Sequence, residues 1–410
     1  MPPPPLEVDE VEPLLEGDED GARLAPGFSP KKKPHPAEMV LANKVFEQSV
    51  QERLPRSLAG KAVAVTGTTS GTGYWCALVA VQKGADAVFL LNRTSHRQKV
   101  SDADMEKAAD RAGGKTAVHS IECDLTSFAS VRAAATEISL RCLALYGGLD
   151  VLACNAGIMA TADERTCDGY DEQMQVNHLS HFLLVKKLMP CLEAAAVQRG
   201  EARVVQHSSG ARFFPLGPLK FGGKHFEQCP RNSLGGNSST FAVVNFAGAQ
   251  NVRYHHSKLA NPVFAMALHA KLLERGSRVK SLVCEPGFAA TSLPANGWQL
   301  DATRTPVSNA VFSAMMPAFR RLCQSGADGA CPLLVACFSE EAGSGDFYVP
   351  EHQMLWCCGL GPYVKGAPIR TVVGGLPRKP KMEERVLKHA HWVALWEASE
   401  KAIGEKFLDP

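Results

Sequence analysis

Thr66-Gly67-Thr68-Thr69-Ser70-Gly71-Thr72-Gly73 is the stretch on which the fold depends, because it joins a short apolar run at 62–65 to a helical stretch at 71–83. An apolar run of this length suits a strand that is buried on both faces. Gly67 allows the sharp exit from that strand, Gly71 lets the backbone approach a pyrophosphate, and Gly73 lets the helix pack closely on the sheet. The helix N-terminus offers unpaired N–H groups and the positive end of its dipole to phosphates. The stretch therefore predicts a dinucleotide-binding turn; a glycine-rich turn without a ligand is the alternative, which the strand-then-helix context disfavours.

Strands and helices alternate along the chain beyond this turn. Short apolar runs predict strands, and longer helical stretches lie between them. The expected strands lie at 62–65, 87–91, 116–121, 149–153, 203–207 and 278–284. The expected helices lie at 37–53, 71–83, 101–113, 126–146, 168–196, 254–275, 306–322 and 381–403. This alternation predicts an α/β fold, a Rossmann-type doubly wound parallel sheet covered on both faces.

Composition divides the chain into four parts. Residues 1–35 are rich in proline, glycine and charge and are expected to be disordered, because they cannot bury enough apolar surface to offset the entropy of ordering. Residues 36–57 predict an N-terminal helix and linker, and 58–375 the catalytic domain. Within that domain, 210–250 is an insert, and long loops of compact domains are often functional. Residues 376–410 predict a C-terminal helical extension, packed on the domain through the tryptophans Trp392 and Trp396.

Charge and cysteine content exclude several classes of protein. The 410 residues carry a net charge of +2, which gives no reason to expect nucleic acid or an anionic membrane surface as a partner. The 13 cysteines show no CxxC pair and no regular spacing, so we expect a reducing compartment and neither a disulfide framework nor a metal site. No apolar segment resembles a signal peptide, and no apolar run reaches the roughly 18 residues that span a bilayer. We therefore expect a cytoplasmic protein without a transmembrane segment; peripheral membrane association stays open.

The end of the second expected strand indicates which dinucleotide is bound. Dinucleotide folds that prefer NAD usually place an acidic residue there to bind the ribose 2′-hydroxyl. Here the sequence reads Leu91-Asn92-Arg93-Thr94, without an acid, and Arg93 can bind a 2′-phosphate through charge-assisted hydrogen bonds. The alternative is that Arg93 is an ordinary surface residue. We expect NADP(H) as the cofactor, with Thr69 and Ser70 of the glycine-rich turn among its other contacts.

Tyr254-His255-His256-Ser257-Lys258 opens one of the expected helices and carries the candidate chemistry. Positions four apart lie on one face of a helix, so Tyr254 and Lys258 are neighbours. The ordinary pKa of a tyrosine is about 10, and a lysine ammonium beside it lowers that pKa. Tyr254 can then give a proton to a carbonyl oxygen as hydride arrives, or take one from an alcohol in reverse. Out of context, an unrelated tyrosine and lysine on an ordinary helix would be the better interpretation.

Polar residues at strand ends and inside a helix supply that context. The apolar strand at 203–207 ends in Ser208 and Ser209, and a serine hydroxyl there can hydrogen-bond a substrate oxygen. An earlier strand ends in Cys154-Asn155-Ala156-Gly157. Asn177 lies within an expected helix despite its poor helix propensity, which favours a polar role for its side chain.

In this order the motifs resemble the short-chain dehydrogenase/reductase family, from about Leu58 to Leu293. The resemblance implies that Tyr254 is the general acid/base and that Lys258 binds the nicotinamide ribose. It implies that Ser209, the second of the serine pair, is the catalytic serine and that Asn177 holds a relay water. It also implies further cofactor contacts, which are Asp124 at the adenine amino group, Asn155 and Gly157 at the adenosine ribose, Pro286 and Gly287 after a late strand, and Thr291 near the nicotinamide.

Two stretches resemble particular subgroups of that family. One is Asp168-Gly169-Tyr170 leading to Val176-Asn177-His178-Leu179-Ser180-His181-Phe182-Leu183-Leu184, and the other is His256-Ser257-Lys258-Leu259-Ala260-Asn261. Both are similar to segments of the retinol dehydrogenases, the WW-domain oxidoreductase and the light-dependent protochlorophyllide reductases. The resemblance implies an NADP(H)-dependent enzyme, often a homo-oligomer, that acts on a bulky apolar carbonyl or alcohol of retinoid, steroid or lipid type. A catalytically silent NADP-binding scaffold and a protochlorophyllide reductase-like enzyme are the alternatives. Cys154 stands where the family commonly has asparagine, and the connection from Ser209 to Tyr254 is longer than in the subgroup, which leaves the substrate open.

Overall fold

Strand β1, Ala62–Thr66, is formed by the apolar run before the glycine-rich turn, and all of its residues are buried. Its side chains alternate between the faces of the sheet: Ala62 and Ala64 pack on one side, and Val63 and Val65 on the other. The computed structural model of the protein describes residues 45–214, 224–237, 241–242, 245–246, 248–287, 289, 324–352 and 374–408. All of these lie in one compact unit, Pro36–Pro410.

Within the described ranges, the sheet that contains β1 has eight strands in the order β10-β9-β8-β5-β4-β1-β2-β3. The other strands are β2 Ala87–Asn92, β3 Ala117–Glu122, β4 Val151–Cys154, β5 Ala202–His207, β8 Val279–Cys284, β9 Phe347–His352 and β10 Gly374–Arg378. Neighbouring strands from β3 to β9 are parallel, and β10 is antiparallel to β9. The direction of winding reverses between β1 and β4, and folds of this kind bind ligands at the carboxyl ends of the strands beside such a reversal.

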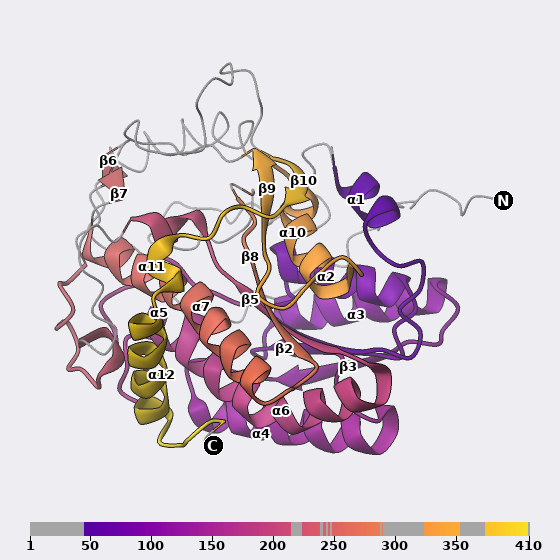
Figure 1. Cartoon of the computed structure of the whole chain (residues 1–410), viewed down its shortest axis with the longest axis horizontal. Coiled ribbons are helices and arrows are strands. Elements are labelled where there is room, and N and C mark those ends of the chain that lie inside the picture. The colour runs from indigo at the N-terminus through magenta and orange to yellow at the C-terminus, as the bar shows by residue number, and fades with distance from the viewer. Residues whose placement is uncertain are drawn as a thin grey trace, which may run out of the picture. The chain divides into compact units, whose positions relative to one another are not determined.

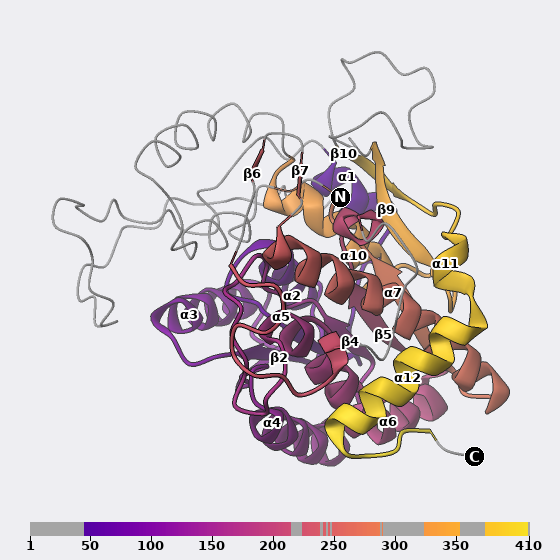
Figure 2. The same ribbon diagram turned by 90° about the vertical axis from the view of Figure 1, so that its left-hand side faces the viewer.

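Helices cover both faces of this sheet (Figures 1 and 2). One hydrophobic cluster joins the sheet to α1 Phe46–Glu52, α2 Gly71–Gln82, α3 His96–Arg111 and α10 Gly326–Phe338. The other joins it to α4 Phe128–Arg141, α6 Ser180–Arg199, α7 Ala249–Glu274 and α12 His389–Ile403. The predicted α/β fold, a doubly wound sheet with helices on both faces, is confirmed.

Helix α12 packs on the outer side of α7 through an aromatic cluster. Trp396 is 4% exposed, and its ring lies 5.2 Å from that of Phe182, 5.8 Å from that of Phe264 and 5.1 Å from that of Phe407, centroid to centroid. A short helix, α11 Glu384–Leu387, precedes α12. The predicted packing of the last helix is therefore confirmed for Trp396. Trp392 is half-buried, and its indole N–H donates to the carbonyl of Val386.

Two of the predicted helices differ from continuous α-helices. The one expected at 126–146 is α4 followed by the π-helix Cys142–Tyr146. The one expected at 168–196 is composed of α5 Glu172–Met174, the π-helix Gln175–Leu179 and α6. Apolar periodicity did not show these breaks because a π-turn adds a residue without interrupting the hydrogen-bonded backbone. The strands expected up to residue 284 are all present.

The C-terminal third contains structure that the sequence did not predict. Helix α10 was missed because Gly326, Gly329 and Pro332 punctuate it, yet from Ala327 to its last residue every side chain is buried. Strand β10 contains two glycines and Pro377, which argue against a strand, but an edge strand tolerates them. Its antiparallel direction corrects the expectation of a wholly parallel sheet. The helix expected at 306–322 and the expected tail at 1–35 lie outside the described residues.

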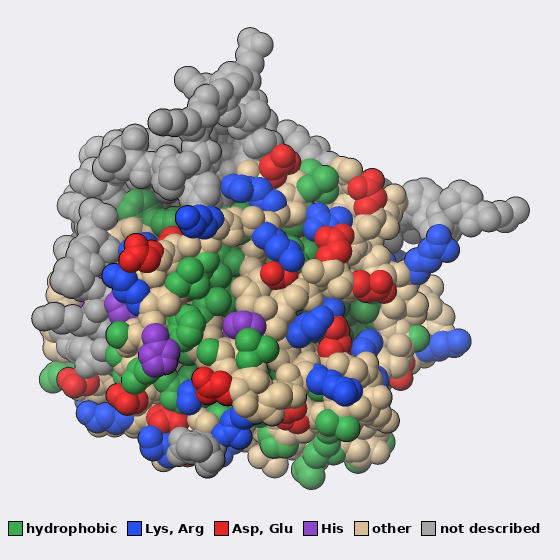
Figure 3. Space-filling view, viewed as in Figure 1, with side chains coloured by type: hydrophobic (Ala, Val, Ile, Leu, Met, Phe, Trp, Pro, Cys, Tyr) green, Lys and Arg blue, Asp and Glu red, His purple; other side chains and the backbone are tan. Residues whose placement is uncertain are grey.

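The surface carries charges of both signs. On the face drawn in Figure 3, lysine and arginine side chains are interleaved with aspartate and glutamate, as the small net charge of +2 suggests. Among the residues that the structure describes, no helix is long and apolar enough to cross a membrane.

Candidate active site

The glycine-rich turn has the backbone shape that its sequence predicts. Gly67 and Gly71 have φ values of +74° and +64°, in the left-handed region that favours glycine. A Cβ on Gly67 would lie 2.9 Å from the Cβ of Ala156, and one on Gly73 would collide with the Asn155 amide and the Gly67 carbonyl. Helix α2 begins at Gly71, and its N-cap residue Ser70 makes no side-chain capping hydrogen bond. This close backbone and the uncapped helix N-terminus fit a pyrophosphate, and so fit a dinucleotide cofactor.

Asn155 holds the turn against the end of β4. Its Nδ2 donates to the carbonyls of Thr66, at 2.9 Å, and Gly67, at 3.3 Å. Its Oδ1 accepts from the Thr72 hydroxyl at 2.8 Å and lies 2.8 Å from His207 Nδ1. These contacts occupy the Asn155 side chain within the protein, so its clearest role is to shape the turn; a contact with the adenosine ribose stays a prediction.

The end of β2 is built so that Arg93 faces solvent. The preceding side chain, Asn92, is tied to the turn: its Oδ1 accepts from the Thr68 N–H at 2.9 Å, and its Nδ2 donates to Thr68 Oγ1 at 2.7 Å. Arg93 is exposed. Asp124 follows β3, is half-buried and accepts from the N–H and the hydroxyl of Thr126, at 2.9 and 2.8 Å. Both residues therefore lie at the carboxyl edge of the sheet, where the resemblance expects the adenosine half of a cofactor.

Tyr254 and Lys258 lie on the buried side of α7, with 4% and 3% of their surfaces exposed. Lys258 Nζ is 6.0 Å from the centroid of the Tyr254 ring and donates to the carbonyl of His207 at 3.0 Å. A side-chain hydrogen bond joins Tyr254 to Ser209, which follows the end of β5. The structure thus brings Ser209, Tyr254 and Lys258 together, although they come from two separate segments of the chain.

The two serines after β5 have different surroundings. Ser208 is 1% exposed, and its hydroxyl donates to the carbonyl of Lys258 at 2.8 Å, so it fastens β5 to α7. Ser209 caps a short 3₁₀-helix, Gly210–Phe213, by accepting from the N–H of Ala211 at 3.2 Å, and its hydroxyl also reaches Tyr254. The choice of Ser209 over Ser208 as the candidate catalytic serine agrees with this geometry.

Burial controls the charge of the central pair. Loss of hydration raises the pKa of Tyr254 to about 12, and the Ser209 hydrogen bond acts in the opposite direction. Loss of hydration lowers the pKa of Lys258 to about 8. Burial thus sets the net direction of the Tyr254 pKa, and a lowering by the Lys258 ammonium stays a prediction. Tyr254 is a neutral phenol at pH 7.

Asn177 lies in the π-helix Gln175–Leu179 and is buried. Its Oδ1 accepts from the N–H of Ile158 at 2.8 Å, while its Nδ2 donates to the Ile158 carbonyl at 2.9 Å and to Ser257 Oγ at 2.8 Å. A Cβ on Gly157 would lie 3.1 Å from both Asn177 Oδ1 and Lys258 Nζ, so this glycine keeps the space between them open. π-Turns are frequent at functional sites, and this one turns Asn177 towards the catalytic helix.

The remaining predicted cofactor contacts are only partly described. Pro286 and Gly287 follow β8, where Gly287 has a φ of +65° and the Pro286 carbonyl accepts a hydrogen bond from Gln324. Thr291 lies outside the described residues, as does part of the insert at 210–250.

Three buried residues of this region were missed from the sequence. His181 Nε2 is 2.9 Å from Thr66 Oγ1, and burial lowers the pKa of His181 to about 4. His207 lies between Asn155 and Lys258, and burial lowers its pKa to about 3. Both imidazoles are therefore neutral at pH 7. Arg253, which precedes Tyr254, is completely buried. Only the proximity of His207 and Arg253 to the candidate serine and tyrosine could have drawn attention to them.

Comparison with known proteins identifies the class of the chain. The family model described as short chain dehydrogenase matches residues 61–218. A polyprenol dehydrogenase from Mus musculus is 30% identical over 258 residues, which are 62% of this chain and 68% of the mouse protein. A retinol dehydrogenase 12 from Bos taurus is 32% identical over 243 residues, which are 59% of this chain and 66% of the bovine protein. The chain belongs to the short-chain dehydrogenase/reductase family of oxidoreductases. Within that family, its relatives place it with the retinol dehydrogenase-like group.

The extent of these matches is limited. The chain matches a smaller part of other relatives. For a short chain dehydrogenase/reductase from Colletotrichum higginsianum, the match spans 55% of that protein's length. Among solved structures, an uncharacterised protein from Mycobacterium paratuberculosis aligns with a TM-score of 0.57 and 23% identity, over 87% of this chain and 98% of that chain. This structural likeness supports the fold.

Proposed function

We propose that the chain is an NADP(H)-dependent oxidoreductase that interconverts a carbonyl and its alcohol by hydride transfer. The observation that carries the proposal is the meeting of Ser209, Tyr254 and Lys258 at the carboxyl end of β5. Asn155 links this site to the glycine-rich turn, because its side chain contacts both His207 and the Gly67 carbonyl. A general acid, a hydrogen-bond donor and a cation at one site are what carbonyl reduction requires.

The chain's own groups manage the proton. Bound NADPH would supply the hydride to the carbonyl carbon. Tyr254, which burial keeps protonated, donates its proton to the carbonyl oxygen, so its O–H bond breaks as the alcohol O–H bond forms. The Ser209 hydroxyl donates a hydrogen bond to the same oxygen, and the Lys258 ammonium stabilises the tyrosinate until it takes up a proton from solvent. Asn177 fixes the loop at Ile158 opposite Ser257, on the helix that carries Tyr254.

We further propose NADP(H) rather than NAD(H). Strand β2 ends without an acidic residue, and the Asn92 side chain is engaged with Thr68. Arg93 is exposed at the end of this strand, so its guanidinium can form charge-assisted hydrogen bonds with the 2′-phosphate.

The proposed substrate is a bulky apolar alcohol or aldehyde. The names of two relatives, polyprenol dehydrogenase and retinol dehydrogenase 12, support this class. All-trans-retinal, polyprenal, a steroid ketone and a long-chain aldehyde are the first carbonyls to test with NADPH.

Substitution of the proposed acid tests the mechanism. Tyr254→Phe should abolish NADPH oxidation with any active carbonyl while NADPH binding, measured by its fluorescence, persists. Tyr146→Phe is the matched control, because this tyrosine hydrogen-bonds His119 away from the site and should retain turnover. Full turnover in Tyr254→Phe would show that another group supplies the proton.

A further inference from the structure

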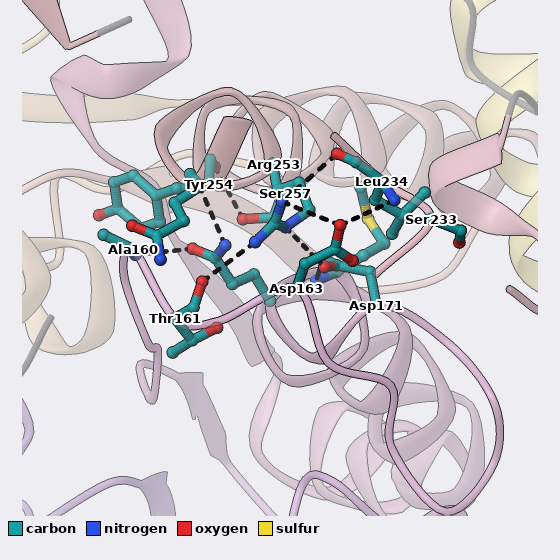
Figure 4. Close-up of polar contacts among 12 residues, drawn as sticks. Ala160, Thr161, Asp163, Asp171, Ser233, Leu234, Arg253, Tyr254 and Ser257 are labelled. Atoms are coloured by element: carbon teal, nitrogen blue, oxygen red, sulfur yellow. Dashed lines mark hydrogen bonds and ion pairs between the residues drawn. The ribbon is translucent and has the colours of Figure 1, made fainter. Parts of the chain in front are cut away.

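Arg253 directly precedes Tyr254 in α7, and its guanidinium is completely buried. Its Nε lies 3.1 Å from Asp171 Oδ2, and its Nη1 lies 3.9 Å from Asp163 Oδ2. Both carboxylates are only 1–2% exposed. We define these residues, Arg253, Asp163 and Asp171, as the Arg253 cluster (Figure 4).

The Arg253 cluster holds a segment of the long connection from both sides of its backbone. Arg253 Nη1 donates to the carbonyls of Leu234, at 3.3 Å, and Gly236, at 3.1 Å. Asp163 Oδ2 accepts from the N–H groups of the same residues, at 2.9 and 2.7 Å. The segment is therefore fixed by charge-assisted bonds to both its donors and its acceptors, which a surface loop does not need.

The same arginine holds the loop that faces Tyr254. Arg253 Nη2 donates to the carbonyl of Thr161 at 3.1 Å. The neighbouring Ala160 has a left-handed φ of 53°, which is costly for a residue other than glycine, and its N–H donates to Gln173 Oε1 at 2.8 Å. Gln173 Nε2 in turn donates to the carbonyl of Gln250 in the first turn of α7, at 3.0 Å. Figure 4 shows Ala160 and Tyr254 on one side of Arg253, with Leu234 and Ser233 on the other.

We propose that Arg253 is a positioning residue for Tyr254. Its hydrogen bonds join the start of the catalytic helix to the loop at 158–163 and to the segment at 231–237, which supports that loop from outside and which we call the brace. The proposal rests on the proposed function, because it assigns Arg253 to the orientation of the acid in that reaction. A 1 Å displacement of a reacting group can lower a rate about 100-fold, so a brace of this kind affects turnover as well as stability.

Kinetics of Arg253→Ala, with all-trans-retinal and NADPH as the probe, test the proposal. We expect kcat to fall about 100-fold while the dissociation constant of NADPH, measured by fluorescence, is unchanged, because the phosphate turn lies on other elements. Methylguanidinium, which fits the space that the truncated side chain leaves, should restore part of kcat. Unchanged kcat in the folded variant, or an equal loss of NADPH binding, would overturn the proposal.

Arg203→Ala is the matched control. Arg203 is 5% exposed, pairs with Glu201 and donates to the carbonyls of Ala336 and Ser339, away from Tyr254. Its loss should lower the melting temperature without lowering kcat of the folded protein. If Arg253→Ala does not fold, Asp163→Asn keeps the shape of the cluster and should lower kcat in the same direction. Wild-type kcat in Asp163→Asn would then overturn the proposal.

Hydrogen exchange separates this proposal from the proposed function. In Arg253→Ala, the amides at 158–163, 234 and 236 should exchange faster than in the wild type. In the control Arg203→Ala, the same amides should not exchange faster than in the wild type. If the wild type reduces no carbonyl but exchange becomes faster in Arg253→Ala, the proposed function is wrong and Arg253 still fixes the two segments. If the wild type is active and the exchange rates of these amides are the same in Arg253→Ala, the positioning role of Arg253 is wrong and the proposed function stands.

Discussion

The ammonium of Lys258 donates a hydrogen bond to the backbone carbonyl of His207, 3.0 Å away. His207 is the last residue of β5, and Asn261, one turn along α7, donates to the same carbonyl at 2.9 Å. The catalytic helix is therefore fastened to the sheet two residues before Ser209. This carbonyl, together with the Ser208 hydroxyl that donates to the carbonyl of Lys258, sets the separation between the candidate serine and the candidate tyrosine.

The pH dependence of turnover should report the charge of Lys258. Its pKa is lowered to about 8, so it is cationic below that pH and loses its proton above it. Carbonyl reduction needs the cation, so kcat/KM should fall as the pH rises through about 8. Lys258→Arg stays charged, and the alkaline fall should be absent from its profile even if turnover is lower. A fall with the same midpoint in Lys258→Arg would assign it to another group.

Arg93→Ala should change the choice of cofactor. Hydrogen bonds to a charged group contribute about 1.5–3 kcal/mol, so the KM for NADPH should rise about 10- to 100-fold, whereas that for NADH should not. Arg111→Ala, at the exposed far end of α3, is the control and should change neither. A wild-type enzyme that prefers NADH would contradict the assignment of Arg93.

Gly73→Ala should lose stability and cofactor binding together. The added Cβ would meet the backbone of Gly67, which cannot move without changing the turn, and overpacking of this kind costs about 1–3 kcal/mol. Thermal denaturation with and without NADPH should show a lower melting temperature and little stabilisation by the cofactor. Gly210→Ala has open space around its Cβ and should melt like the wild type. An undiminished NADPH-induced shift in Gly73→Ala would show that the phosphates bind elsewhere.

Asp171→Asn should remove a pH dependence of stability. Burial raises the pKa of Asp171 from 3.8 to about 6, with the Met174 N–H and Arg253 acting in the opposite direction. The folded protein therefore holds a proton that the unfolded chain has released between about pH 4 and 6, and raising the pH through that window lowers stability. The free energy of unfolding of Asp171→Asn, relative to the wild type, should rise by up to about 3 kcal/mol from pH 4 to 7. Urea denaturation at each pH measures it, and parallel curves would contradict the prediction.

Trp396→Ala should show that α12 is an integral part of the domain. Trp396 packs against Phe182, Phe264 and Phe407, and removal of a buried tryptophan costs about 3–5 kcal/mol. Val393 lies on the same helix and is 41% exposed, so the free energy of unfolding of Val393→Ala should stay within about 0.5 kcal/mol of the wild-type value. Equal stabilities in urea would mean that the last helix is dispensable.

The sequence predicted the part of the fold in which local signals and tertiary structure agree. From β1 to β5, apolar runs alternate with helical stretches, and the elements appear where they were expected. Helix α10 is different, because its glycines and Pro332 oppose a helix and only burial against the sheet stabilises it. Propensity cannot show a gain that depends on partners distant in the sequence.

The candidate site divides in the same way. Ser209, Tyr254 and Lys258 could be predicted because each stands in a short motif, and their proximity follows from the fold. The upward shift of the Tyr254 pKa could not be predicted, since it depends on how much water burial removes from the phenol. Arg253 could not either, because Asp163 and Asp171 are more than eighty residues away in the chain.

The π-turn at Gln175–Leu179 has a consequence for how this segment tolerates change. Removal of one residue from this turn would allow a continuous α-helix from α5 into α6, although the sequence of the segment would hardly change. Each residue of an α-helix advances about 100° around the axis, so the deletion would swing Asn177 away from Ile158 and Ser257. The spacing between Asp171 and Ser180 is thus as important to the site as the identity of Asn177. Single-residue deletions here should be far more damaging than conservative substitutions.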